Sequence, residues 1–169
     1  NQDLATYLSS GFWNDFGQTP RKFNLTNNGI YAKNGILTYN TTGNIYDPNG
    51  ISSERSYLID ESFKLLQSTL GINFQKTTNF EADLRFSDSS SEAFASSSTF
   101  SDNIIYSHIN IPSNWNGSLN GFGNYTFHTI LHEIGHALGL GHLGNYNGTA
   151  SYTSDAIYSN DSWQSSIMS

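Results

Sequence analysis

The chain has 169 residues, of which 36% are hydrophobic and 14% aromatic, enough for one domain with a packed core. Its net charge of −7 and its lack of a basic patch argue against nucleic acid and anionic membranes as partners. The absence of cysteine excludes disulfides, thiolate metal sites and cysteine nucleophiles, and no apolar run is long enough to predict a membrane span.

Two short elements are expected in the first forty residues. The segment DLATYLSSGFW (3–13) is typical of a short helix, which Gly11 would end. The segment GILTYN (35–40) has the composition of a strand and is bounded by Gly and Asn turn signals.

A long helix is predicted within ISSERSYLIDESFKLLQSTLG (51–71). Apolar residues recur there at helical spacing and form one stripe, Ser52 or Ser53 can cap the start, and Gly71 can end the helix. Asp60 and Lys64 stand four residues apart, which predicts an ion pair on the outer face of the helix.

Strand patterns dominate the middle of the chain. INFQKT (72–77), ADLRFS (82–87) and NIIYSHINIP (103–112) indicate three more strands, whereas SEAFASSSTFS (91–101) fits either a loop or an edge strand. Together with a second long helix further on, this layout predicts an α+β or α/β fold with one twisted sheet. Of the two, we expect the α+β class, with a mainly parallel sheet.

Four of the five histidines lie between residues 128 and 142. From about 125 to 140, apolar residues recur at helical spacing and leave His132 and His136 one turn apart on the opposite side. An i,i+4 histidine pair can supply two nitrogen ligands to one zinc ion. Gly139 tolerates positive φ, so the chain can turn there and bring His142 back as a third ligand.

Glu133 is the candidate general base. It lies next to His132 but about 100° further around the helix, so its carboxylate points past the metal. There it can take a proton from a water molecule that zinc activates and later pass it to the leaving amine. His128 is about 12 Å along the helix axis from His136, so we expect it at the surface or supporting a ligand. We interpret His108, which lies in a strand pattern, as an ordinary strand histidine and not as a metal ligand.

The segment HEIGHALGLGH (132–142) resembles the signature of the metzincin zinc endopeptidases, HExxHxxGxxH, which is followed by a methionine turn. Met168, in SWQSSIMS, is similar to the turn methionine. Within the metzincins the chain looks most like the serralysins. The stretches that carry this resemblance are GNYTFHTILHEIGHALGLGH, GNYNG, ADLRFSDSS and SSGFW. Serralysins usually have proline after the third histidine, where this chain has Leu143.

The resemblance implies one catalytic domain over residues 1–169. Residues 1–142 would form an upper lobe that contains the active-site helix, and residues 143–169 would begin an irregular, incomplete lower lobe ending at the Met-turn. It also implies that Ala93, Phe94, Ala95 and Ser96 belong to an edge strand that pairs with extended substrate. The family tyrosine, the S1′ wall and the calcium-binding repeats would lie beyond Ser169.

The expected function is therefore that of a zinc-dependent endopeptidase acting on extended protein or peptide substrates. The resemblance implies a secreted, bacterial, monomeric protein, a proteinaceous inhibitor or propeptide as a further partner, and Ca²⁺ only if a repeat domain lies outside this chain. A matrixin-type branch is less favoured, since no second structural zinc cluster is visible. The alternative of another class is a non-catalytic or impaired metzincin-fold binding or surface module.

Overall fold

The computed structural model describes residues 2–115, 125–148, 150–159, 161–162 and 166–169. A five-stranded sheet has the order β2-β1-β3-β5-β4, and all neighbouring strands are parallel except β4, which is antiparallel to β5. This confirms the mainly parallel sheet, and it shows that the ambiguous serine-rich segment is an edge strand. The strands are β1 (Ile36–Asn40), β2 (Asn73–Lys76), β3 (Leu84–Ser87), β4 (Phe94–Phe100) and β5 (Asn103–Asn110).

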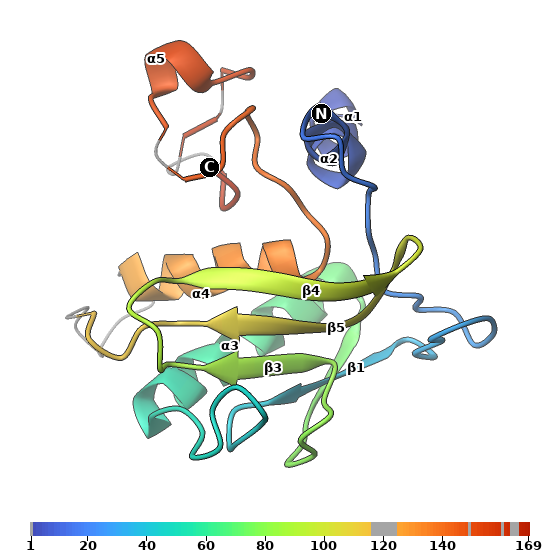
Figure 1. Cartoon of the computed structure of the whole chain (residues 1–169), viewed down its shortest axis with the longest axis vertical. Coiled ribbons are helices and arrows are strands. Elements are labelled where there is room, and N and C mark those ends of the chain that lie inside the picture. Colours follow the sequence, from blue (N-terminus) through green and yellow to red (C-terminus); the bar gives the residue numbers. More distant parts are fainter. Residues whose placement is uncertain (1, 116–124, 149, 160, 163–165) are drawn as a thin grey trace.

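Two long helices, α3 (Ser53–Leu70) and α4 (Tyr125–Ala137), cover one face of the sheet (Figure 1). Alternate strand residues point toward these helices because side chains on a strand alternate between faces. The core that results includes side chains that are fully buried, namely Leu37, Ile59, Leu84, Phe86, Ile104, Ile109, Ile130 and Ile134. This layer holds α4 rigidly against the sheet, with β4 alongside it.

The helix α3 begins and ends as predicted. The Ser52 hydroxyl accepts a hydrogen bond from the Arg55 N–H at 3.3 Å, and Gly71 closes the helix at a φ of 69°. The predicted Asp60–Lys64 pair is wrong. Lys64 bonds Glu61 instead, because Asp60 is turned to Lys76 of β2, which lies beside it at 2.8 Å.

The N-terminal helix is longer than predicted. It runs through α1 (Gln2–Thr6), a π-helical turn (Tyr7–Gly11) and α2 (Phe12–Asp15), so Gly11 does not end it. Gly11 keeps helical angles, and the Phe12 N–H donates to the Tyr7 carbonyl. The reason is tertiary: the final turn is held by packing against the loop that follows α4.

The active-site helix, predicted to reach about residue 140, ends three residues earlier, at Ala137. Gly139 has a φ of 107°, and the Leu140 N–H returns to the Gly135 carbonyl at 3.0 Å, so the chain reverses its course. The described residues from 143 onward, including α5 (Tyr152–Asp155), then lie beyond α4 on the side where the N-terminal helices are found (Figure 1). No described helix is both long and apolar enough to cross a membrane.

Candidate metal centre

Three imidazoles meet just past the end of α4. The Nε2 atom of His136 lies 3.0 Å from that of His132 and 3.1 Å from that of His142, and the remaining pair is 3.3 Å apart. They are the cluster of potential metal ligands found in the described part of the chain. The turn at Gly139 therefore brings His142 back to the other two, as expected from the sequence.

The arrangement fits zinc. A tetrahedral ion with nitrogen ligands at about 2.0–2.1 Å places those nitrogens roughly 3.3 Å from one another. Backbone carbonyls fix two of the rings, because the Nδ1 atoms of His132 and His136 lie 2.6 Å from the Ile167 oxygen and 2.8 Å from the Leu140 oxygen. Bonds of this kind place the ring proton on Nδ1 and leave the Nε2 lone pair for a metal.

Burial also lowers the pKa of each of the three histidines. Desolvation, together with a smaller effect of the two neighbouring histidines, lowers the pKa of His136 to about 3, and desolvation chiefly lowers the pKa of His142 to about 4. The pKa of His132 is lowered as well, again chiefly by burial. All three imidazoles are therefore neutral near pH 7, which is the form that coordinates a cation.

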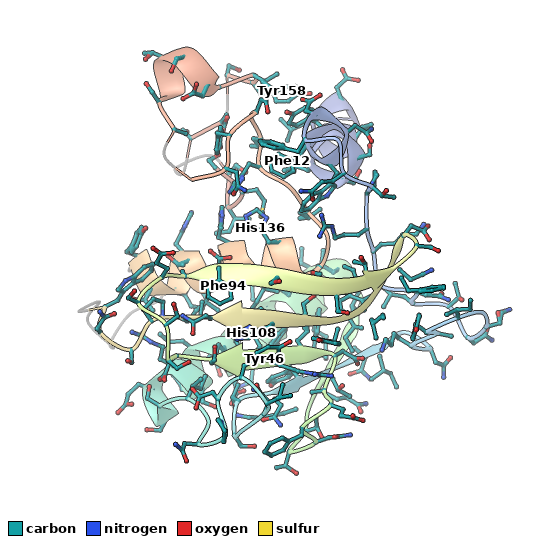
Figure 2. The ribbon with its side chains drawn as sticks, viewed as in Figure 1. Phe12, Tyr46, Phe94, His108, His136 and Tyr158 are labelled. Atoms are coloured by element: carbon teal, nitrogen blue, oxygen red, sulfur yellow. The ribbon has the colours of Figure 1, made fainter. Side chains whose placement is uncertain are left out.

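The N-terminal helix supports the third histidine. The Phe12 ring packs edge-on against the His142 ring at 5.4 Å, and the Trp13 indole donates to the Gly139 carbonyl at 2.8 Å. Figure 2 shows Phe12 pointing from the N-terminal helix toward the segment after α4. A Cβ on Gly141 would lie 2.2 Å from the Phe12 ring, so only glycine allows this contact. This role of Phe12 was not predictable from the sequence, since no local pattern links residues 12 and 142.

Met168 lies against α4 at Gly135 and is 1% exposed. Its sulfur is so close to Gly135 that a Cβ there would be only 2.4 Å away. Leu143, the residue that replaces the usual proline, is completely buried, and its N–H donates to the Met168 carbonyl at 3.3 Å. Proline has no N–H, so this bond depends on the departure from the family pattern.

Glu133 is 7% exposed, and burial raises the pKa of its carboxyl group to about 7. It shares a hollow of about 610 Å³ with His132, Glu92 and Ala93. A carboxyl group with a pKa near neutrality can both accept and release a proton at physiological pH.

Three of the four residues expected to bind substrate border the centre, although Ala93 lies just before the first residue of β4 and not within the strand. Ala93 lines the hollow beside Glu133, while Ala95 and Ser96 line a second hollow beside His136 and His142. Phe94 is the exception: its ring packs against His108 at 5.2 Å (Figure 2). Phe94 therefore points away from the histidine cluster, because neighbouring strand residues face opposite sides of the sheet.

The other two histidines stand apart from the cluster. His128 is half-buried and lines the hollow of Glu133. His108 lies in β5, where its ring is stacked on Tyr46 at 3.8 Å and its Nε2 is 2.7 Å from the Ser87 hydroxyl.

A tyrosine that sequence reasoning did not assign lies directly on the cluster. The Tyr146 ring packs on His142 at 5.0 Å, and its hydroxyl donates to buried Asp161 at 2.7 Å. Tyr158, by contrast, packs on Tyr7 at 5.7 Å. The side chain of Tyr152 and residues 123–124 and 163–165 of the family-like segments lie outside the described residues.

No family model matches the chain. Serralysin C of Dickeya chrysanthemi is 56% identical over 52 residues, which is 29% of this chain and 11% of that protein. Metalloprotease AprA of Pseudomonas entomophila is 50% identical over 52 residues, or 29% of this chain and 10% of that protein. The matched stretch thus spans about a tenth of the length of these curated relatives.

Among solved structures, high choriolytic enzyme 1, a hatching enzyme zinc-protease from the medaka Oryzias latipes, aligns with a TM-score of 0.39. It is 20% identical over 66% of this chain and 48% of that chain. A structural similarity with so low a TM-score and identity supports no conclusion about function.

Proposed function

We propose, from the premise that this chain is a serralysin-like metzincin over its histidine segment, that it hydrolyses internal peptide bonds as a zinc-dependent endopeptidase. His132, His136 and His142 would hold the ion, and extended proteins or peptides would be the substrates. The observation that carries the proposal is the convergence of the three Nε2 atoms within 3.3 Å, beside the buried carboxyl group of Glu133.

Each residue has a distinct part in this proposal. Zinc, when bound, supplies Lewis acidity, which makes water acidic near neutral pH and polarises a carbonyl group. Glu133 accepts a proton from the attacking water and passes it to the departing amine, a task that suits a carboxyl pKa raised to about 7. Met168 and Tyr146 do not react. Met168 packs against Gly135 of α4 and Tyr146 packs against the His142 ring, and so both help to keep the donor atoms in place.

The edge strand β4 would hold the peptide. No other strand of the described chain covers its outer edge, since β4 is last in the sheet order. Its backbone N–H and C=O groups can bond an extended chain without selecting a particular sequence. Ala93, Phe94, Ala95 and Ser96 would contribute chiefly through their backbone. Secretion and bacterial origin follow from the resemblance and remain part of this proposal.

The direct test is casein digestion by the full-length protein and by Glu133→Gln, each with and without a chelator. Wild type is expected to cleave. Glu133→Gln is expected to lose about 10²- to 10⁴-fold in rate, the contribution typical of a general base, while keeping its zinc by metal analysis. Chelation should abolish cleavage, and added zinc should restore it.

Glu92→Gln is the matched control, because Glu92 is an exposed carboxylate that lines the same hollow. Its activity should stay close to that of wild type. Equal cleavage by Glu133→Gln and wild type would remove Glu133 from the mechanism. A wild-type protein that binds zinc but cleaves nothing would favour the non-catalytic module instead.

A further inference from the structure

Arg21 is a cation at the edge of the metal centre, and no acidic side chain among the described residues forms an ion pair with it. Its guanidinium group lies 3.9 Å over the Trp13 ring, and its Nη2 donates to the amide oxygen of Gln18. Its Nε is buried without a hydrogen-bond partner. The ion pairs within the described part of the chain are made by Lys33, Lys64 and Lys76. Partly buried charges are usually paired, so an unpaired one in a cleft calls for a ligand.

Arg21 lines a hollow that also reaches two of the clustered histidines. A hollow of about 230 Å³ is lined by Arg21 and Trp13 on one side, by residues 95–97 of β4 on another, and by His136 and His142 at its end. Its described lining contains no Asp or Glu. The hollow on the other side of the histidines contains both Glu92 and Glu133. Of these two hollows, the one lined by residues 95–97 of β4 therefore contains a cation, and the one lined by Ala93 contains carboxyl groups.

The arginine is held in position before any ligand arrives. Trp13, on which it stacks, is fixed by its bond to the Gly139 carbonyl at 2.8 Å, and the next residue, Lys22, pairs with Asn103 of β5. Less side-chain entropy is lost on binding when a side chain is already ordered. The planar guanidinium group offers several N–H donors in one fork, a geometry that matches a carboxylate.

The direction of a bound peptide follows from β4. Ala93, which comes directly before β4, lines the hollow of Glu133, and residues 95–97 within β4 line the hollow of Arg21, so the chain runs from the first hollow to the second. Antiparallel pairing is the more stable arrangement per residue, so a peptide on the free edge would run the opposite way. Its N-terminal residues would then lie beside Arg21 and its C-terminal residues beside Glu133.

We propose that Arg21 selects substrates that carry an Asp or Glu side chain a few residues before the scissile bond. This inference rests on the proposed endopeptidase function and adds a substrate class to it. The protein as a whole carries a charge of −7, so it does not attract acidic peptides in general. The preference should therefore come from one local contact and be confined to one position of the peptide.

The test uses pairs of quenched fluorescent peptides that differ only by Glu or Gln at the second, third or fourth residue before the scissile bond. The full-length protein should cleave one Glu peptide about 10-fold faster in kcat/KM than its Gln partner, as expected for one charged hydrogen-bonded contact. In Arg21→Gln the ratio should fall to about one. Because both peptides are measured on one preparation, any loss of folded protein cancels in the ratio.

Lys22→Gln is the matched control, since it removes the same charge one residue further on and Lys22 does not line this hollow. It should keep the wild-type ratio. A ratio near one in wild type, or an equal preference in Arg21→Gln, would overturn the inference. So would a Glu preference found only after the scissile bond.

Binding separates this inference from the proposed function. If wild type cleaves none of the peptides, the endopeptidase proposal fails, but the fluorescence anisotropy of the same peptides still reports on Arg21. Tighter binding of a Glu peptide that is lost in Arg21→Gln and kept in Lys22→Gln would support the acidic subsite alone. Equal binding of the Glu and Gln peptides by wild type would overturn it.

Discussion

At the scale of single residues, His108 shows how burial controls a titratable group away from the metal centre. Its ring lies between Tyr46 and Phe94 on the sheet face opposite α3 and α4 (Figure 2). Burial, together with a smaller effect of the positive charge of Arg85, lowers its pKa to about 4. His108 is therefore neutral in the folded protein over a pH range in which an exposed histidine is charged.

This depressed pKa predicts a loss of stability in acid. Between about pH 6.5 and pH 4 the unfolded chain binds a proton at residue 108 and the folded chain does not. Lowering the pH through this window should therefore reduce the free energy of unfolding. At about 1.4 kcal/mol per pKa unit, and allowing for partial exposure of the ring, we expect His108 to account for about 1–3 kcal/mol.

Urea denaturation of wild type and His108→Gln at pH 7 and pH 4.5 checks this prediction. Glutamine can keep a hydrogen bond to Ser87 but has no proton to gain, so the variant should lose less stability in acid. The clustered histidines titrate in both proteins, and their effect cancels in the comparison. An identical loss in the two proteins would contradict the prediction.

At the scale of elements, the decisive feature is the turn between α4 and the third histidine. Gly139 combines a φ of 107° with very close packing, because a Cβ there would lie 2.2 Å from the Arg21 carbonyl oxygen. Backbone atoms cannot move aside as the end of a side chain can. This turn, rather than helix α4 alone, therefore determines where His142 lies.

Gly139→Ala should weaken zinc binding about 10- to 100-fold, if the 1–3 kcal/mol of backbone strain falls on the turn that holds His142. Chelator competition measures the affinity. Gly71→Ala is a suitable control, since Gly71 ends α3 at positive φ with no atom within 4 Å of its added Cβ. It should lower stability without changing zinc affinity. Wild-type affinity in Gly139→Ala would show that the turn does not position His142.

At the scale of the whole molecule, the histidine cluster joins parts that are distant in sequence. It links α4 to the following loop, which in turn contacts the N-terminal helix through Phe12 and the last residues through Met168. An ion at this point would be bound by the folded chain and not by the unfolded one. Its binding free energy would thus add to the stability of the fold.

Zinc should therefore raise the thermal midpoint of the metal-free protein. At a free concentration about 1,000 times the Kd, linkage predicts about 4 kcal/mol. For a protein of this length, that corresponds to a rise of about 8–16 °C. Calorimetry with and without zinc measures the shift. Glu133→Gln should keep it and His142→Ala should lose most of it, whereas an unchanged wild-type midpoint would argue against metal binding by the folded chain.

Much of the local structure was predictable from residue patterns. The periodicity of α3 and α4, the capping by Ser52 and Gly71, and the strand composition of the middle segment depend on neighbours in the sequence. The grouping of His132, His136 and His142 was predictable for a related reason, because eleven residues contain both the helical spacing and the glycine that turns the chain.

Other features required the folded molecule. The sequence alone left residues 91–101 open between a loop and an edge strand, and pairing with β5 decided that question. It placed the end of the first helix at Gly11 and paired Asp60 with Lys64, and tertiary packing changed both.

Local spacing thus determined the grouping of His132, His136 and His142 by itself, together with the elements that carry them. Only the tertiary structure revealed the support of His142 by Phe12, the contact of Tyr146, and the position of Arg21 beside the cleft. The physical reason is the range of the interactions. Helical spacing and turn geometry act over a few residues, whereas packing brings together side chains more than a hundred residues apart. The sequence around either residue therefore gives no sign of such a contact.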